Sequence, residues 1–260
     1  MSDSWRKLDF TDVPEFREAG AGYQDVYIRD RLGIRAMSFG NGEKQSAMRL
    51  GKPRALAIEY TRRIMAFLLF HPAPHDILMI GLGGGSLAKF IYYEMPGAST
   101  IVAEVNPKVV AVARSHFQLP SDDKRLRVVI AEGSSYLATH TNSAEVLIVD
   151  GFNANGQVSS LCSRTFYRHC FDALRPGGVF VANLLRFDMN TDLYLKRIHA
   201  SFGDAVRVLT TGEDGNLVVF AFRDARTLAQ GLKQTERAKA LKATYGLAFP
   251  VFVREMRSPS

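Results

Sequence analysis

A glycine-rich turn sets the strongest constraint on the fold of this chain. The segment DILMIGLGGGSLAKF, residues 76–90, reads as a buried strand, a turn and then a helix. In the turn, Gly81, Gly83 and Gly85 allow a sharp bend and a close approach of the backbone to a ligand. We expect Gly81, Gly83, Gly84 and Gly85 to contact the cofactor. The first N–H groups of the helix point to the same place, which is typical of a nucleotide site. The same turn can also serve packing alone.

The segments after residue 76 define the fold class. Apolar runs that read as strands alternate with helical patterns, as in a parallel sheet with helices on both faces. Residues 205–224 then form two β-rich runs around a GEDGN turn, which predicts a C-terminal antiparallel hairpin. We therefore predict an α/β fold with a doubly wound, Rossmann-like sheet of the methyltransferase type, because a dinucleotide-binding sheet normally continues in parallel. The expected parallel strands are residues 76–81, 99–105, 126–131, 145–150 and 178–184.

The N-terminal part of the chain has a different pattern. Residues 1–20 are polar with little periodicity, whereas residues 21–52 alternate apolar and polar side chains around GNGE. The alternation predicts two or three antiparallel strands with a glycine-rich hairpin turn. A helix is expected at about 55–70. We thus expect an N-terminal extension with a small β-hairpin domain at 1–54 and the α/β domain at 55–260.

Composition excludes several classes of protein. With 260 residues and 47% apolar content, the chain can bury a full core. Neither Cys162 nor Cys170 belongs to a C-x-x-C pair, and the six histidines are scattered, so no disulfide framework and no metal site are expected. The first residues lack the apolar core of a signal peptide, and the longest apolar run, 64–70, is too short to cross a bilayer. These features predict a cytoplasmic protein without a membrane partner.

The net charge of +7 raises the question of nucleic-acid binding. Residues 225–260 carry seven Lys/Arg against two Asp/Glu, so much of the excess lies near the C-terminus. These charges are spread along KQTERAKALKATYG, as on the solvated face of a helix, rather than clustered in a basic stripe. No nucleic-acid partner is expected.

Acidic residues follow three successive strands. Glu104 ends the second strand, Glu132 and Gly133 follow the third, and Asp150 follows the fourth. Each acid alone could be a helix cap or a solvated loop residue. Because ligands in open α/β sheets lie across the carboxyl ends of the strands, the three together predict one crevice beside the glycine turn. Glu104, 21 residues beyond Gly83, suits the hydroxyl groups of a ribose, and Glu132 suits an adenine amino group.

Several further motifs are similar to those of one enzyme family. YQDVYI, EKQSAMRL, IEYTRRIM and VDGFNANG...TFY resemble segments of the spermidine synthase family, the polyamine aminopropyltransferases. The similarity runs from Tyr23 to about Leu185, and the GLGGGSL and VDGF segments are closest to a divergent bacterial, spermidine synthase-like branch. The resemblance implies a homodimer that binds decarboxylated S-adenosylmethionine. It would transfer the aminopropyl group to a small-molecule amine such as putrescine and release methylthioadenosine.

The resemblance also implies roles for individual residues. A sulfonium is a good leaving group, so the enzyme has to align the reactants and remove a proton from an amine that is mostly charged near pH 7. The residues that match the family pattern are Gln24 and Gln45 at the nucleoside and its sulfur end, Glu104 at the ribose, Glu132 at the adenine, Asp150 as the acid that orients and deprotonates the amine, and Tyr60 in the amine channel.

The sequence departs from the family at three places. Gly84 stands where the family has the Asp that holds the donor's amine, and Asn153 stands where a second loop acid holds the diamine. Thr61 and Arg62 replace the polar and acidic residues after the channel tyrosine, which would add a guanidinium to the site. The net positive charge points the same way, since a polyamine site should be acidic. S-adenosylmethionine carries a carboxylate that the missing Asp would repel, so the donor could be its decarboxylated or its intact form.

The sequence therefore leaves more than one function open. Aminopropyl transfer is the leading hypothesis. A methyltransferase that uses S-adenosylmethionine on an unknown acceptor is the second, and a nucleoside-binding protein without turnover is the third. An NAD-dependent oxidoreductase comes last, because the C-terminal hairpin and Ser86, at the sixth position of the dinucleotide fingerprint, both disfavour it.

Overall fold

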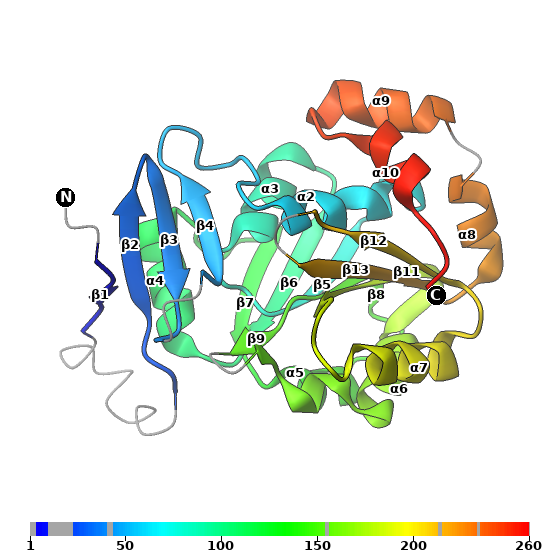
Figure 1. The fold of residues 1–260 in the computed structure, drawn as a ribbon, viewed down its shortest axis with the longest axis horizontal. Helices are drawn as coiled ribbons and strands as arrows, with labels where there is room; N and C mark the ends of the chain where they lie inside the picture. Colours follow the sequence, from blue (N-terminus) through cyan, green and yellow to red (C-terminus); the bar gives the residue numbers. More distant parts are fainter. Residues whose placement is uncertain are drawn as a thin grey trace.

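The chain forms an α/β body with a small antiparallel sheet at one end (Figure 1). The structure is a computed structural model that describes residues 4–9, 23–40, 44–153, 156–212, 215–232 and 235–259.

Seven strands form the central sheet, in the order β12-β13-β11-β8-β5-β6-β7. The five expected parallel strands are all present, although β11 begins four residues earlier than predicted, with a register shift between Leu174 and Val179. The last strand, β13, lies between β11 and β12 and is antiparallel to both, which confirms the predicted methyltransferase-type sheet. Glu213 and Asp214 of the hairpin turn lie outside the described residues. The strand bounds are β5 (Asp76–Ile80), β6 (Ser99–Glu104), β7 (Leu126–Ile130), β8 (Ala144–Val149), β11 (Leu174–Leu185), β12 (Val206–Thr210) and β13 (Asn216–Phe222).

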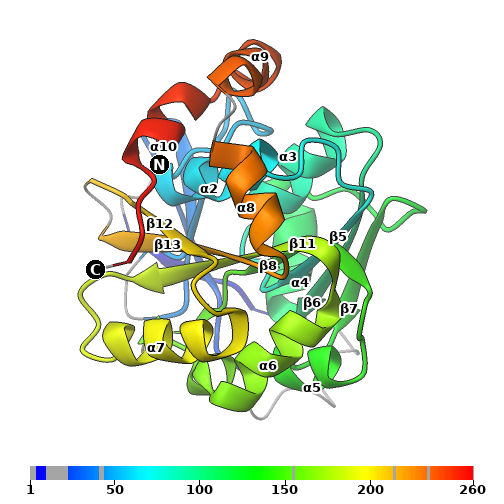
Figure 2. The same cartoon turned by 90° about the vertical axis from the view of Figure 1, so that its right-hand side faces the viewer.

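Helices cover both faces of this sheet (Figure 2). Helices α5, α6 and α7 lie on one face, and the remaining helices lie on the other. The helix bounds are α2 (Glu59–Ile64), α3 (Ser86–Glu94), α4 (Pro107–Phe117), α5 (Gly133–Ala138), α6 (Arg164–Ala173), α7 (Thr191–Phe202), α8 (Ala225–Leu232), α9 (Thr235–Tyr245) and α10 (Phe249–Glu255).

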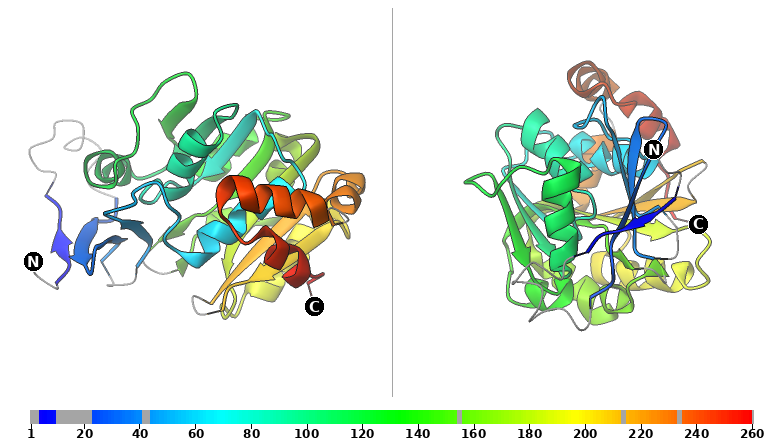
Figure 3. Two further views of the ribbon diagram at one scale, coloured as in Figure 1. Left: turned by 90° about the horizontal axis from the view of Figure 1, so that it is seen from above. Right: turned by 90° about the vertical axis from the view of Figure 1, so that its left-hand side faces the viewer.

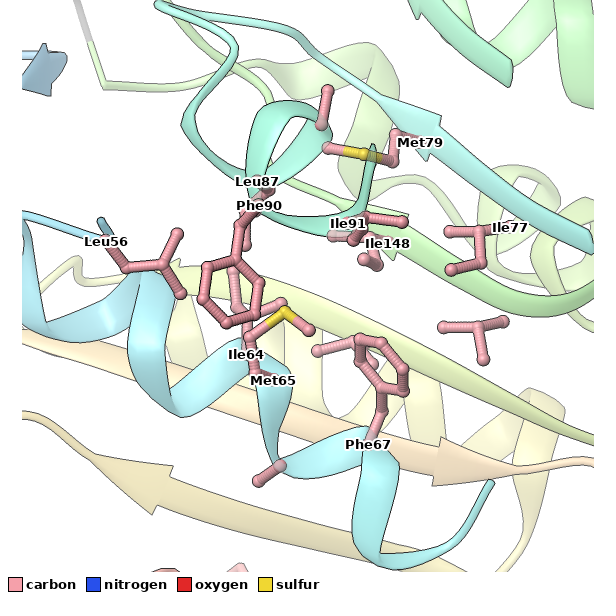
Figure 4. Packing of buried hydrophobic residues seen from close by; sticks show 14 of the residues in the cluster. Leu56, Ile64, Met65, Phe67, Ile77, Met79, Leu87, Phe90, Ile91 and Ile148 are labelled. Carbon is pink, nitrogen blue, oxygen red and sulfur yellow. The ribbon is translucent and has the colours of Figure 1, made fainter. Parts of the chain in front are cut away.

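The core is divided by the sheet into two apolar layers. Successive side chains of a strand point to opposite faces, so Ile77 and Met79 of β5 join one layer while Leu78 and Ile80 join the other. Figure 4 shows the first layer, in which Ile77 and Met79 lie near Ile91 of α3. Strands buried on both faces explain the continuous apolar runs of the sequence.

The helix expected at about 55–70 differs in the structure. The α-helix α2 begins only at Glu59, and a 3₁₀ helix, η1 (Met65–Leu69), replaces its last part. Arg62 donates hydrogen bonds to the carbonyl groups of Leu56 and Ala57, which satisfies these carbonyls in a non-helical conformation and delays the start of the helix. In η1 every side chain is buried, so packing rather than an amphipathic face determines its geometry.

The N-terminal sheet has four antiparallel strands in the order β1-β2-β3-β4, and Figure 3 shows it at the end of the molecule away from the C-terminal helices. The turn between β2 and β3 is made by Leu32 and Gly33, both with positive φ. The GNGE segment lies in the connection between β3 and β4, which pair antiparallel as predicted. Asn41, Gly42 and Glu43 of that segment lie outside the described residues. The domain division at residues 54 and 55 stays a prediction. The strand bounds are β1 (Arg6–Lys7), β2 (Tyr27–Arg31), β3 (Ile34–Ser38) and β4 (Ser46–Arg49).

Three further features bear on the class of protein. Helix α9 buries only Ala238 and Leu241 and leaves most of its charged side chains in solvent, as expected for its spaced charges. Cys162 and Cys170 are both buried and reduced. In the part of the chain that the structure describes, no helix has the length and apolarity to cross a bilayer.

Candidate active site

A pocket of about 420 Å³ lies at the carboxyl ends of the parallel strands, which is a typical size for a small-molecule site. It is bounded by the start of β4, by α2, and by the segments that follow β5, β6, β7 and β8. Most of the residues singled out from the sequence lie on its wall: Gln24, Gln45, Tyr60, Gly81, Gly83, Glu104, Glu132, Gly133, Asp150 and Asn153.

The glycine turn brings two strands into direct contact. Gly81 has a φ of +94°, which side chains rarely allow, and a Cβ atom on it would collide with the backbone carbonyl of Asp150. The absence of a side chain therefore lets the end of β5 and the end of β8 meet beneath the pocket. Gly85, the N-cap of α3, packs against Leu119 and is not on the pocket wall.

Gly84 is a glycine because its neighbours leave no room for a side chain. A Cβ atom there would lie 2.7 Å from Cδ1 of Phe117 and 2.8 Å from Oγ of Ser46. Both distances are shorter than van der Waals contact. Gly84 is not on the pocket wall, so the structure does not support the direct ligand contact that we expected for it. The end of α4 and the start of β4 occupy the space that a side chain at position 84 would need.

Glu104 lies on the pocket wall with both carboxylate oxygens already engaged by the backbone. Its Oε2 accepts a hydrogen bond from the N–H of Leu82 at 2.9 Å, and its Oε1 accepts one from the N–H of Asn106 at 2.9 Å. Burial raises the pKa of Glu104, and these N–H groups oppose that effect. Because each carboxylate oxygen has a second lone pair, the side chain can still accept hydrogen bonds from a ligand hydroxyl.

Glu132 has a structural role in addition to its place in the pocket. It is the N-cap of α5, and its Oε2 accepts a hydrogen bond from the N–H of Ser135 at 2.7 Å. Its Oε1 accepts one from the hydroxyl of Ser160 at 3.1 Å. Burial opposes ionisation, but the N–H groups at the start of the helix outweigh it and lower the pKa of Glu132. The carboxylate is therefore held ionised and in a fixed orientation.

Asp150 follows β8 and is held by one donor on each side. The hydroxyl of Tyr60 donates to its Oδ2 at 3.1 Å, and the side-chain amide of Asn183 donates to its Oδ1 at 2.9 Å. Burial raises the pKa of Asp150, and the hydrogen bonds from Asn183 and Tyr60 counteract the rise. A carboxylate with a raised pKa and fixed geometry has the properties of a general base.

The guanidinium expected from Arg62 is not in the pocket. Arg62 lies two residues after Tyr60, about 200° around the helix, and it bonds to the carbonyl groups of Leu56 and Ala57 instead. Thr61 does lie on the wall, where its hydroxyl donates to the carbonyl of Ile58. The expectation that α2 adds a positive charge to the site was therefore wrong.

The charge of the pocket differs from that of the whole chain. Its wall carries the carboxyl groups of Glu104, Glu132 and Asp150, and no Lys, Arg or His among the described residues. The net charge of +7 resides elsewhere, on surfaces such as α9. The argument that the positive charge disfavours a cationic ligand is therefore incorrect, because the local field of the pocket is negative.

Sequence reasoning missed several residues of the site. Asn183, Ser46, Asn106 and Ser160 hold the acids or line the pocket. Asn183 lies near the carboxyl end of the fifth strand, so the strand-end rule that identified the three acids would have found it if amides had been included. No cluster of three or more potential metal ligands occurs in the described ranges.

Comparisons with known proteins identify the family. A model of the spermine/spermidine synthase domain matches residues 58–208. The polyamine aminopropyltransferase of Chromobacterium violaceum is 36% identical over 241 residues, covering 93% of this chain and 92% of that protein. This chain belongs to the spermine/spermidine synthase family.

Other members of this family extend the comparison. The polyamine aminopropyltransferase of Neisseria meningitidis serogroup A is 33% identical over 234 residues, covering 90% of this chain and 89% of that protein. The crystal structure of spermidine synthase from Thermotoga maritima has a TM-score of 0.69 at 22% identity, covering 92% of this chain and 82% of that chain. At this identity the structural likeness shows the fold alone. The family explains both the methyltransferase-type sheet and the N-terminal sheet.

Proposed function

We propose that this chain transfers the aminopropyl group of decarboxylated S-adenosylmethionine to a di- or polyamine. One observation carries the proposal. The Asp150 carboxylate, held between Tyr60 and Asn183, lies on the wall of a pocket with two further acids and no described cationic side chain. In a chain that is similar to polyamine aminopropyltransferases over nearly its whole length, this wall suits two cationic reactants.

The proposal gives the residues of the pocket wall the roles that the family resemblance implies. Glu104 would accept hydrogen bonds from the ribose, and Glu132 with Gly133 would contact the adenine. Gln24 and Gln45 would contact the sulfur end of the donor, and Asn153 would face the acceptor. Each of these assignments is part of the proposal.

Asp150 would act on the attacking amine. As the amine loses a proton to the Asp150 carboxylate, its lone pair forms a C–N bond to the aminopropyl carbon next to the sulfonium. The C–S bond breaks, and its electron pair returns to sulfur, which leaves methylthioadenosine as a neutral thioether. Tyr60 would keep the carboxylate aligned with the amine, so that proton removal and attack occur in one geometry.

The charge of the wall favours the decarboxylated donor. Intact S-adenosylmethionine would bring a carboxylate into a pocket that already holds three, with no described Lys or Arg to pair with it. Both donors bring an ammonium that the acidic wall attracts, but intact S-adenosylmethionine also brings a carboxylate that this wall disfavours. This argument disfavours methyl transfer, the second hypothesis from the sequence.

A product assay tests the proposal. Purified protein is incubated with decarboxylated S-adenosylmethionine and putrescine, spermidine or cadaverine, and separately with S-adenosylmethionine and a cell extract. We expect methylthioadenosine in the first reaction only. S-adenosylhomocysteine in the second reaction would indicate a methyltransferase, and tight nucleoside binding without either product would indicate a binding protein. Asp150→Asn should abolish transfer and leave the affinity for methylthioadenosine nearly unchanged.

The homodimer and the cytoplasmic location that the resemblance implies are part of the proposal as well. Light scattering on the purified protein tests the first, and fractionation of cells that express the tagged chain tests the second.

A further inference from the structure

A series of hydrogen bonds between side chains runs across the sheet and ends at Asp150. The amide of Asn183 donates to Asp150 Oδ1 at 2.9 Å, and the amide of Asn216 donates to Asn183 Oδ1 at 3.0 Å. The two asparagines lie on neighbouring strands, β11 and β13, and are 1% and 7% exposed. Neither of them is on the pocket wall.

The hydrogen-bonding capacity of these groups determines which atom of each amide donates and which accepts. An ionised carboxylate can only accept hydrogen bonds, so Asn183 must present its NH₂ group to Asp150 and its oxygen to Asn216. Asn216 must then present its own NH₂ group. The position of Asn216 is fixed by Thr211, whose hydroxyl accepts a hydrogen bond from the backbone N–H of Asn216 at 2.9 Å.

We propose that Asn183 and Asn216 are positioning residues that keep Asp150 ionised and correctly oriented to accept the proton of the amine. This inference rests on the proposed function, in which Asp150 is the base. Asn216 acts through Asn183, because it prevents the Asn183 amide from turning its oxygen toward the carboxylate. A reversed amide would place two acceptors against each other and would favour the protonated form of Asp150.

The other groups around Asp150 do not substitute for the hydrogen bonds that come from Asn183 and Asn216. Tyr60 on α2 supplies the second donor to the carboxylate. Glu104 at the end of β6 and Glu132 at the start of α5 share the pocket, but the pKa of Asp150 is raised by burial and lowered by the hydrogen bonds from Asn183 and Tyr60. No described Lys, Arg or His lines the pocket. Donated hydrogen bonds are therefore the means by which the described residues stabilise the charge on Asp150.

The substitution Asn216→Asp tests the direction of the chain. A carboxylate at position 216 requires a donor, so the Asn183 amide turns and its oxygen faces Asp150. We expect the acid limb of the kcat/KM profile to move to higher pH by about one pH unit or more, so that the rate measured on this limb falls about tenfold or more. The KM for the donor should change less than about twofold, because no group that faces the nucleoside is altered. Asn216→Ala, which only removes the anchor, should give a smaller shift in the same direction.

A matched control separates this effect from a change in net charge. Asn190→Asp adds the same charge at the exposed N-cap of α7, outside the hydrogen-bonded chain, and should leave the pH profile unchanged. If the acid limbs of both folded Asn216 variants coincide with that of the wild type, the inference is wrong.

The carboxyl ¹³C resonance of Asp150 provides a readout that does not depend on catalysis. It can be assigned by its absence in Asp150→Asn and titrated in the wild type and in both Asn216 variants. A raised pKa in Asn216→Ala, which adds no charge near Asp150, supports the inference even if the wild type transfers no aminopropyl group, in which case only the proposed function fails. An unchanged pKa in Asn216→Ala and Asn216→Asp contradicts the inference even if the wild type is fully active.

Discussion

The hydroxyl of Tyr60 donates a hydrogen bond to Oδ2 of Asp150 across 3.1 Å, which joins helix α2 to the end of strand β8. The two residues are 90 positions apart in the sequence. The contact places a phenol beside the carboxylate that we propose as the base, and it gives a direct way to alter the properties of that carboxylate.

Replacing Tyr60 should change the pH dependence of the enzyme. Tyr60→Phe removes one donor from the ionised carboxylate, so the pKa of Asp150, already raised by burial, should rise further. A hydrogen bond to a charged group contributes about 1.5–3 kcal/mol, so the acid limb of kcat/KM should move to higher pH by about one to two units. Tyr92→Phe is the control, because Tyr92 donates to Asp123 at 2.8 Å on the surface. A shift of equal size in both variants would contradict the prediction.

Restoring the acid of the family at position 84 should fail. Gly84→Asp would force a side chain against Phe117 and Ser46, and overpacking of this kind costs about 1–3 kcal/mol of unfolding free energy. Thermal unfolding should show a loss of that size without a gain in affinity for the donor. Gly97→Asp is the control, because no atom lies within 4 Å of a Cβ at Gly97. The cost of Gly84→Asp should shrink in a Phe117→Ala background, and strictly additive costs would refute the steric explanation.

The carboxylate of Glu104 should contribute to donor binding. Glu104→Gln places an NH₂ group against the N–H of Leu82 or of Asn106 and removes the charge, so the KM for the donor should rise about tenfold or more. Glu145→Gln is a matched control. Glu145 also accepts hydrogen bonds from backbone N–H groups, at the opposite end of the sheet, so its substitution should lower stability and leave the KM unchanged. An equal KM in both variants would exclude a contact between Glu104 and the donor.

The buried Lys89 should make stability depend on pH. Its Nζ donates to the carbonyl of Phe117, and desolvation lowers its pKa from 10.5 to about 8. Between these values the unfolded chain binds more protons than the folded one, so the unfolding free energy should rise with pH from about 8 to 10.5. The shift corresponds to a cost of roughly 3 kcal/mol for the charged form of Lys89. Replacing Lys89 would remove this cost and would also lose the hydrogen bond to Phe117, which contributes about 1 kcal/mol.

The substitution Lys89→Met isolates this effect. It should raise the unfolding free energy at pH 7 by about 2 kcal/mol and remove the rise above pH 8, as measured by urea denaturation across the pH range. Lys242→Met on the exposed face of α9 should keep the wild-type dependence. If the rise above pH 8 persists in Lys89→Met, another group is responsible for it.

The parallel core of the fold could be predicted because its strands are buried on both faces. Such strands appear in the sequence as continuous apolar runs. A polar ligand binds at the carboxyl ends of these strands, so acids such as Glu104 and Asp150 stand where the apolar runs end. Strand β1 was missed because it consists only of Arg6 and Lys7, both exposed on the edge of the N-terminal sheet. Two exposed residues leave no alternation to detect.

The features of the site that could not be predicted depend on where side chains point and on how much room surrounds them, rather than on residue type. The orientation of Arg62 follows from its angle around α2, and the lack of room at Gly84 follows from Phe117, which is 33 positions away. The link from Asn216 to Asp150 requires the order of the strands in the sheet. None of these relationships leaves a local pattern in the sequence.

The insertion of β13 between β11 and β12 has a consequence during synthesis of the protein. Every described side chain on the pocket wall belongs to the chain up to Leu161, so a nascent polypeptide has a complete set of ligand-facing groups at that point. Asn183 and Asn216 leave the ribosome later, and β13 can enter the sheet only after both of its neighbours exist. A chain that stops at Leu161 therefore carries every described residue of the pocket wall. It lacks β11 and β13, against which α2 packs to position Tyr60, as well as the two asparagines that support Asp150.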